Sequence, residues 1–190
     1  MGIGTARGKR RTRALRAVAA LVVAGALTAA AGGDRARDYA QGRGLAGTGN
    51  AIGFPHARVG TAYWVSMPVQ ENVTGRPLTL LRTEWLHVPA GLRVLRYGVV
   101  TVEETGGQGL FASDDEDFAR AVPGARVHAA RPVRVPPHGR ADAYALARVQ
   151  VTGPVHEDLS GYRVWYRQGA VEYRQDLDWQ VGLRPEGDRA

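Results

Sequence analysis

Histidine and serine are the first side chains to consider as a general base and a nucleophile. The 190 residues include no cysteine, which excludes disulfides, thiolate metal sites and a cysteine nucleophile. His156-Glu157 begins the H-E-x-x-H pattern of zinc proteases, but Ser160 stands where the second histidine is required. None of the three serines lies in the G-x-S-x-G elbow of a hydrolase. The remaining candidates are His56, His87, His128, His138, Ser66 and Ser113.

These residues are scattered along the sequence, so any site that uses them must be assembled by the fold. Copper or zinc could gather distant histidines, and a Ser-His-Asp triad is recognised by geometry and not by sequence order. The sequence therefore leaves a small exported hydrolase or metal-binding protein as an alternative function, built from dispersed histidines and acidic residues. We assign no catalytic, cofactor-binding or metal-binding residue and expect no cofactor.

An acidic stretch, Ser113-Asp114-Asp115-Glu116-Asp117, offers the oxygen ligands that Ca²⁺ prefers. Ser113 and Glu116 are also spaced as a capping box, and acidic residues stabilise the positive end of a helix. We therefore predict a short helix here and not a calcium site. Its core-facing residues are expected to be Phe118, Ala119 and Val122, and Pro123-Gly124 is expected to end it.

Asp176 and Asp178 could be mistaken for a catalytic pair of carboxylates. Both lie on one parity of the last predicted strand, together with Arg174 and Gln180. Because alternate residues of a strand share a face, these four side chains are expected on the polar face. We interpret the two aspartates as solvated strand charges.

Gly42-Arg43-Gly44-Leu45-Ala46-Gly47 matches the G-x-G-x-x-G spacing of dinucleotide-binding proteins. That fingerprint requires a strand before it and a helix after it. Here it follows a charged segment and lies within residues 32–59, which are rich in glycine and poor in large apolar residues. We therefore interpret residues 32–59 as a flexible linker and expect no nucleotide site.

Aromatic residues on the arginine-rich polar faces are the candidate recognition surface. Interfaces are enriched in tryptophan, tyrosine and arginine, which often carry much of the binding energy. The sequence does not fix the parity of these rings, so packing in the core or on an edge strand is the other interpretation. The candidate rings are Trp64, Tyr97, Tyr144 and Trp165.

The net charge of +7 is concentrated at the N-terminus. Six basic residues precede the first acidic residue, Asp34, and the remainder has 19 arginines and no lysine against 18 acidic residues, a net charge of +1. A nearly neutral body lacks the basic surface that binding to a phosphate backbone requires. The composition therefore excludes nucleic acid as a partner.

Residues 1–31 predict an N-terminal hydrophobic helix that is a signal peptide or a membrane anchor. Basic residues from Arg7 to Arg16 precede an uncharged Ala/Val/Leu run, residues 17–31, which ends in small residues suited to cleavage. The run is slightly short for a span of roughly 20 residues, and both interpretations stay open. Either one keeps the basic end in the cytoplasm, so the body is predicted to be extracytoplasmic, secreted or anchored to the membrane.

The clearest strand pattern lies near the C-terminus. Two alternating segments flank Gln168-Gly169 and predict a β-hairpin with one buried and one solvated face. Its buried residues are expected to be Tyr162, Val164, Tyr166, Val171, Tyr173, Leu177, Trp179, Val181 and Leu183. The other expected strands cover residues 62–71, 78–88, 92–102, 127–135 and 141–152.

About seven antiparallel strands and one short helix follow from these patterns. Strands with one solvated face form antiparallel sheets, and two such sheets bury their apolar faces against each other in a β-sandwich. The fold class is therefore predicted to be all-β. The spacing favours a single Ig-like Greek-key β-sandwich over residues 60–185, followed by a tail of residues 186–190.

Three segments resemble the second half of exported bacterial Ig-like and fibronectin-III-like domains of uncharacterised function. They are Pro136-Pro137-His138-Gly139, Gly161–Tyr166 and Val171–Leu183. The resemblance implies an exported β-sandwich and names no ligand. Together with the absence of a reactive constellation, it predicts a non-catalytic binding or accessory module of the cell envelope. Its partner would be an envelope protein or polysaccharide, with membrane contact through residues 1–31 if these are not cleaved.

Overall fold

The computed structural model describes residues 39–47, 49–107 and 112–185. The predicted helix of residues 1–31, the first part of the predicted linker and the tail 186–190 lie outside these residues. Across the described ranges, no helix has the length and apolar character needed to cross a membrane.

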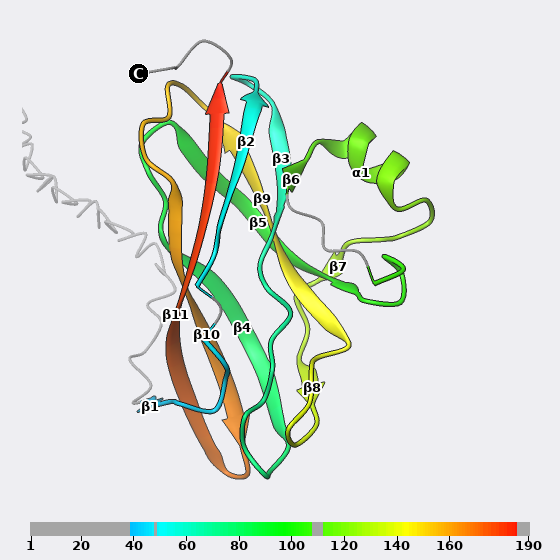
Figure 1. The fold of residues 1–190 in the computed structure, drawn as a ribbon, viewed down its shortest axis with the longest axis vertical. Helices are drawn as coiled ribbons and strands as arrows, with labels where there is room; N and C mark the ends of the chain where they lie inside the picture. Colours follow the sequence, from blue (N-terminus) through cyan, green and yellow to red (C-terminus); the bar gives the residue numbers. More distant parts are fainter. Residues whose placement is uncertain (1–38, 48, 108–111, 186–190) are drawn as a thin grey trace, which may run out of the picture. The chain divides into compact units, whose positions relative to one another are not determined.

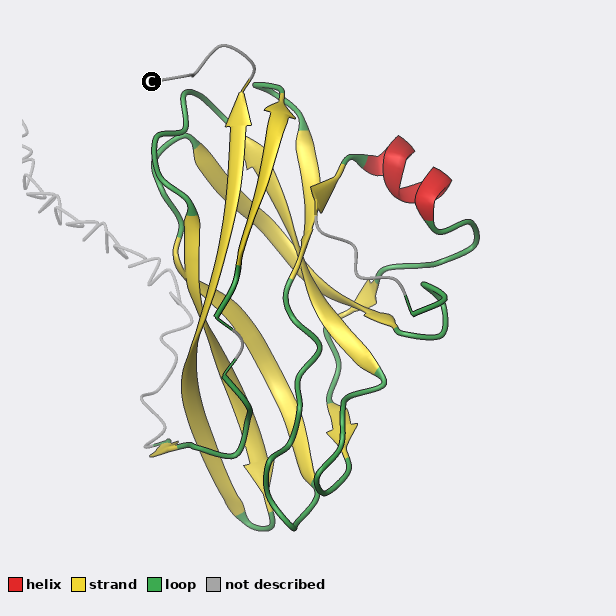
Figure 2. Ribbon diagram, in the orientation of Figure 1, coloured by secondary structure: helices red, strands yellow, loops and turns green. Residues whose placement is uncertain are grey.

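The described residues form two β-sheets and one short helix, so the predicted all-β class is confirmed (Figures 1 and 2). Sheet 1 has the strand order β1 (Ala40–Gln41), β11 (Val171–Pro185), β10 (Leu159–Gln168), β4 (Leu78–His87) and β8 (Val133–Val135), with β2 (Ala51–Ala57) also paired to β11. Sheet 2 has the order β6 (Ala112–Ser113), β3 (Ala62–Ser66), β9 (Ala143–Val151), β5 (Leu92–Thr101) and β7 (His128–Ala129). The helix is α1 (Asp115–Ala121).

The main core contains side chains from both sheets, including Val65 and Val149 of sheet 2 and Val164 and Val181 of sheet 1. Each large apolar side chain buried there stabilises the fold by about 1.5–3 kcal/mol. The predicted C-terminal hairpin is confirmed. Trp179 and Val181 are 8% and 0% exposed, while Asp178 and Gln180 between and beside them are exposed. Val171 and Tyr173, at the start of β11, are more exposed than predicted.

The turn of this hairpin has two residues, because β10 ends at Gln168 and β11 begins at Val171. Gly169 has a φ of 63°, a left-handed conformation that glycine adopts without steric cost. The glycine break seen in the sequence is therefore the hairpin turn.

The structure differs from the predicted linker between residues 39 and 57. This segment, which we call the N-terminal strap, pairs with β11 through two parallel strands, at Ala40↔Tyr173 for β1 and Ile52↔Val181 for β2. Leu45 between the two strands is 3% exposed and belongs to the main core. The linker interpretation is wrong here, because the segment pairs with β11, buries Leu45 and packs Gly42 and Gly44 against Tyr166.

Strand β3 is also shorter and more buried than the predicted strand 62–71. Tyr63 and Val65 face the main core, while Trp64 on the other face packs against Phe118 of α1, with ring centroids 6.4 Å apart. The helix therefore covers part of the outer face of sheet 2, and the expected alternation of buried and exposed residues is lost. The predicted strand 127–135 is likewise divided into the short strands β7 and β8.

Candidate recognition surface

Trp165 is partly exposed on the outer face of sheet 1. Its neighbours along β10, Val164 and Tyr166, are buried, so Trp165 has the opposite parity. Across the sheet, Trp165 lies between Arg82 of β4 and Arg174 of β11. Of the four rings considered from the sequence, Trp165 is the one that combines partial exposure with arginine neighbours on an open sheet face.

Two arginines and a tyrosine pack around the indole of Trp165. The guanidinium carbon of Arg82 lies 4.5 Å from the ring centroid and that of Arg163 lies 5.9 Å from it. Tyr39 meets the indole edge to face, with centroids 6.4 Å apart. Cation–π contacts at exposed sites are worth about 0.5–1 kcal/mol each. The Trp165 face, as we define it, consists of Tyr39, Arg82, Glu84, Arg163, Trp165, Arg167, Arg174 and Asp176.

Carboxylates hold two of these arginines in place. Arg163 donates two hydrogen bonds to Asp176, with Nε–Oδ1 and Nη2–Oδ2 distances of 2.6 and 2.8 Å, and Arg82 Nε donates to Glu84 Oε1. The hydrogen bonds from Arg163 lower the pKa of Asp176, and the same contact raises the pKa of Arg163. Both shifts favour the charged forms, so this pair presents ordered charges on the face.

The two aspartates of β11 are surface charges, as predicted. Asp176 is paired with Arg163 on the outer face, and Asp178 is exposed on the same strand.

The other candidate rings pack inside the protein. Trp64 is 4% exposed and its Nε1 donates a 3.0 Å hydrogen bond to Asp115 Oδ1, while Arg96 and Arg148 stack on its ring at 4.9 and 5.1 Å. Tyr144 is buried, and the hydroxyl of Tyr97 accepts a 3.1 Å hydrogen bond from the backbone N–H of Trp85. For these three rings the core interpretation applies.

The acidic stretch forms the predicted helix, with one correction at its start. Asp114 is the N-cap, because its Oδ1 accepts a 2.9 Å hydrogen bond from the Asp117 backbone N–H. The predicted cap, Ser113, lies one residue earlier in β6. Phe118 and Val122 are buried as predicted, whereas Ala119 is exposed.

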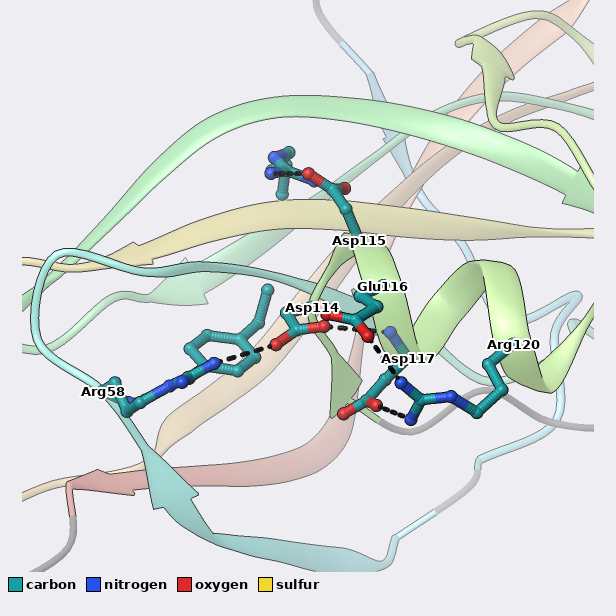
Figure 3. Close-up of polar contacts among 8 residues, drawn as sticks. Arg58, Asp114, Asp115, Glu116, Asp117 and Arg120 are labelled. Carbon is teal, nitrogen blue, oxygen red and sulfur yellow. Dashed lines mark hydrogen bonds and ion pairs between the residues drawn. The ribbon is translucent and has the colours of Figure 1, made fainter.

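The four carboxylates at the start of this helix pair with three arginines (Figure 3). Asp114 pairs with Arg58 at 3.2 Å, and Glu116 and Asp117 both pair with Arg120 at 2.8 and 2.6 Å. Asp115 points away from them, and a hydrogen bond from Arg148 lowers its pKa. Each of the four carboxylates is thus paired with an arginine and Asp115 points away from the others, so the four are not arranged as the ligands of one calcium ion.

Two of the five histidines, His87 and His128, form separate pairs with acidic residues. His87 Nε2 lies 2.9 Å from Glu157 Oε2, and His128 Nε2 lies 2.8 Å from Glu104 Oε1. A backbone hydrogen bond from Thr101, with a further contribution from His128, lowers the pKa of Glu104 to about 2. Among the residues that the structure describes, no three His, Asp or Glu side chains are grouped to hold a metal ion.

One serine lies beside a histidine and an acid. Ser160 of β10 and His87 of β4 are cross-strand neighbours, and both line an open polar hollow with Glu157 and Arg184. No hydrogen bond joins Ser160 to His87 in the described part of the chain. The side chains of His87 and Glu157 are 49% and 70% exposed, so water surrounds them. The hollow has the residue types of a triad without its hydrogen-bond relay.

Two glycines of the G-x-G-x-x-G segment, Gly42 and Gly44, pack on Tyr166. A Cβ at Gly42 would lie 2.4 Å from the Tyr166 hydroxyl oxygen, and the Gly44 N–H donates to that oxygen at 2.9 Å. The amide of Gln175 accepts a hydrogen bond from the Leu45 N–H at 3.1 Å and donates to the Leu45 carbonyl at 2.9 Å. Gln175 was the one polar residue on the buried parity of β11, which is the sequence signal for this contact.

A small cavity of about 40 Å³ lies between the two sheets and has room for a few water molecules. Gln70 lines it and is 4% exposed. Its Nε2 donates to the Pro68 carbonyl and the Tyr162 hydroxyl, while its Oε1 has no partner among the described residues. The remaining lining is largely apolar. The cavity gives room for water next to the Gln70 side chain.

No family model and no curated protein matches this chain. One solved structure that is similar, "Structure of Vibrio cholerae VesB protease", has a TM-score of 0.34 and 13% sequence identity. The match covers 74% of this chain and 32% of that chain, so this chain spans about a third of that protein's length. A likeness this distant carries no argument about fold or activity. These comparisons assign no family.

Proposed function

We propose that this protein is a non-catalytic binding module of the bacterial cell envelope, carried by an Ig-like Greek-key β-sandwich outside the cytoplasm. The N-terminal segment, residues 1–31, exports the domain or anchors it in the membrane. The Trp165 face is the surface that recognises the partner.

The strand order supports the Ig-like assignment. In constant-type Ig domains, strands B, E and D are neighbours in one sheet and strands C, F and G in the other. Here β3, β9 and β5 are neighbours in sheet 2, and β4, β10 and β11 are neighbours in sheet 1. Assigning these six strands in chain order as B to G leaves β6, α1, β7 and β8 as an insertion between D and E.

The observation that carries the proposed binding role is the ordered cluster around Trp165. Trp and Arg are the residues most enriched at binding hot spots, and immobilising such side chains before binding reduces the entropy lost on association. Arg82 and Arg163 are already fixed by the indole and by carboxylates. The surface is therefore prepared for recognition without rearrangement.

Photo-cross-linking in the native host tests this role. A benzoylphenylalanine at position 165 is expected to give a discrete cross-linked product, whereas the same probe at Arg93, on the outer face of sheet 2, is expected to give none. Products of equal yield from both positions, or none from position 165, would refute the proposed surface. Protease treatment of cells stripped of their outer layers but with an intact cytoplasmic membrane tests the location, since an anchored extracytoplasmic body is then degraded without lysis of that membrane.

The alternative function, a small exported hydrolase, is favoured by the hollow that contains Ser160, His87 and Glu157. It ranks second because Ser160 is not hydrogen-bonded to the imidazole and the site is open to water. Hydrolysis of p-nitrophenyl acetate by the wild type that disappears in Ser160→Ala would favour this alternative over the binding role.

A further inference from the structure

The Trp165 face and the row of residues beside it have a charge pattern that indicates the kind of partner, an inference that rests on the proposed binding function. Two cross-strand rows carry the relevant side chains. One row runs from Arg174 through Trp165 to Arg82. The next row runs from Glu172 through Arg167 and Thr79 to Arg134 of β8.

Three arginines of these rows form what we call the basic strip: Arg134, Arg167 and Arg174. All three are exposed, and none of them forms an ion pair within 4 Å among the residues that the structure describes. Arg82 is different, because it is paired with Glu84. With Glu172 the strip carries three positive charges against one negative charge, so its local field attracts an anion.

We propose that the partner is a protein that places a short acidic segment, a cluster of Asp or Glu side chains, on the basic strip. Arginine suits this role because its planar fork binds a carboxylate through two parallel hydrogen bonds. The contact between Arg163 and Asp176 on the same face already has this geometry, at 2.6 and 2.8 Å.

Two features favour a short protein segment over a long anionic polysaccharide. Asp176 and Glu84 flank Arg163 in the row beyond Trp165, so a repeating polyanion laid across the sheet would meet carboxylates of its own sign. A sugar ring that stacks on tryptophan needs a free aromatic face, whereas the Arg82 guanidinium already covers the Trp165 ring at 4.5 Å. The basic strip is therefore a short site, and the row beyond Trp165, with Asp176 and Glu84, limits its extent on one side.

Binding of a synthetic peptide to the full chain tests the proposal. The probe is a fluorescein-labelled dodecapeptide of alternating glutamate and glycine, and the same peptide with lysine in place of glutamate is the control probe. We expect the acidic peptide to bind, the lysine peptide not to bind, and affinity to fall as salt is raised. Binding of polygalacturonate, measured in the same way, tests whether the strip recognises an anionic polysaccharide instead.

A charge-matched pair of variants locates the binding. Arg167→Glu combined with Arg174→Glu is expected to weaken acidic-peptide binding about tenfold, because two attractive pairs become repulsive. The control combines Arg93→Glu and Arg126→Glu, which change the net charge equally but lie outside the strip, and should leave the affinity unchanged.

Three outcomes would overturn the inference: no binding of the acidic peptide, equal weakening in both double variants, or binding of polygalacturonate with none of the peptide. A partner cross-linked through position 165 alongside any of these outcomes would leave the binding function standing and remove only the acidic partner. If position 165 gives no cross-linked product but the acidic peptide still binds through the basic strip, the proposed binding role in the host fails and the anion-binding property of the strip stands.

Discussion

Replacing Gln175 by leucine tests whether one side-chain amide holds the N-terminal strap on β11. The variant loses two hydrogen bonds, to the N–H and to the carbonyl of Leu45. At about 1 kcal/mol for each net hydrogen bond, the strap should be destabilised by about 2 kcal/mol. That free energy corresponds to about a 30-fold increase in the population of the detached strap.

Hydrogen exchange is the suitable assay because it reports local opening residue by residue. The reporter is the Gly42 amide, because it donates to the Arg174 carbonyl at 2.7 Å and keeps that acceptor in the variant. Its exchange should accelerate about 30-fold, by the same conversion of free energy to population. Gln180→Leu is the matched control, since it places the same substitution on β11 at an exposed side chain. If the Gly42 amide exchanges at the wild-type rate in Gln175→Leu, the Gln175 side chain does not hold the strap and the reasoning fails.

Three further predictions concern packing, pH and exposure. Gly42→Ala should lower the melting temperature, because its Cβ would lie 2.4 Å from the Tyr166 hydroxyl, whereas Gly53→Ala, with no atom within 4 Å, should not. The pKa of Asp115 is lowered in the folded state, so its ion pair stabilises the fold above the unfolded pKa of about 3.9 and this is lost as pH falls through the folded value. As pH is lowered below about 4, the free energy of unfolding, measured by urea titration, should therefore fall less for Asp115→Asn than for the wild type. Trp165→Phe should remove most acrylamide-accessible tryptophan fluorescence, since the other three tryptophans are 4–8% exposed.

Alternation of side chains was sufficient to predict the hairpin of β10 and β11, because each strand has one buried face and a glycine turn between them. The same rule failed at β3, where Trp64 on the outer parity is covered by Phe118 of α1. A local pattern cannot report that a segment fifty residues away will cover a strand. The helix itself was predicted from its acidic start, although the cap is Asp114 and not Ser113.

The candidate surface was only partly predictable. The sequence analysis left the parity of Trp165 open, and its place on the outer face follows from the burial of Val164 and Tyr166 on either side of it. Its arginine neighbours could not be predicted, because Arg82 and Arg174 come from strands that lie next to β10 only after the sheet forms. Composition misled us over the strap, where glycine next to Tyr166 serves close packing and gives no freedom to the chain.

The strap has a practical consequence for anyone who shortens this protein. A fragment that starts at Gly60, the boundary suggested by composition, would lose the parallel partners of β11 and the buried side chain of Leu45. One edge of β11 would then be left unpaired, and the exposed N–H and C=O groups of an edge strand are a common cause of aggregation. Fragments intended for crystals or binding assays should begin before residue 39.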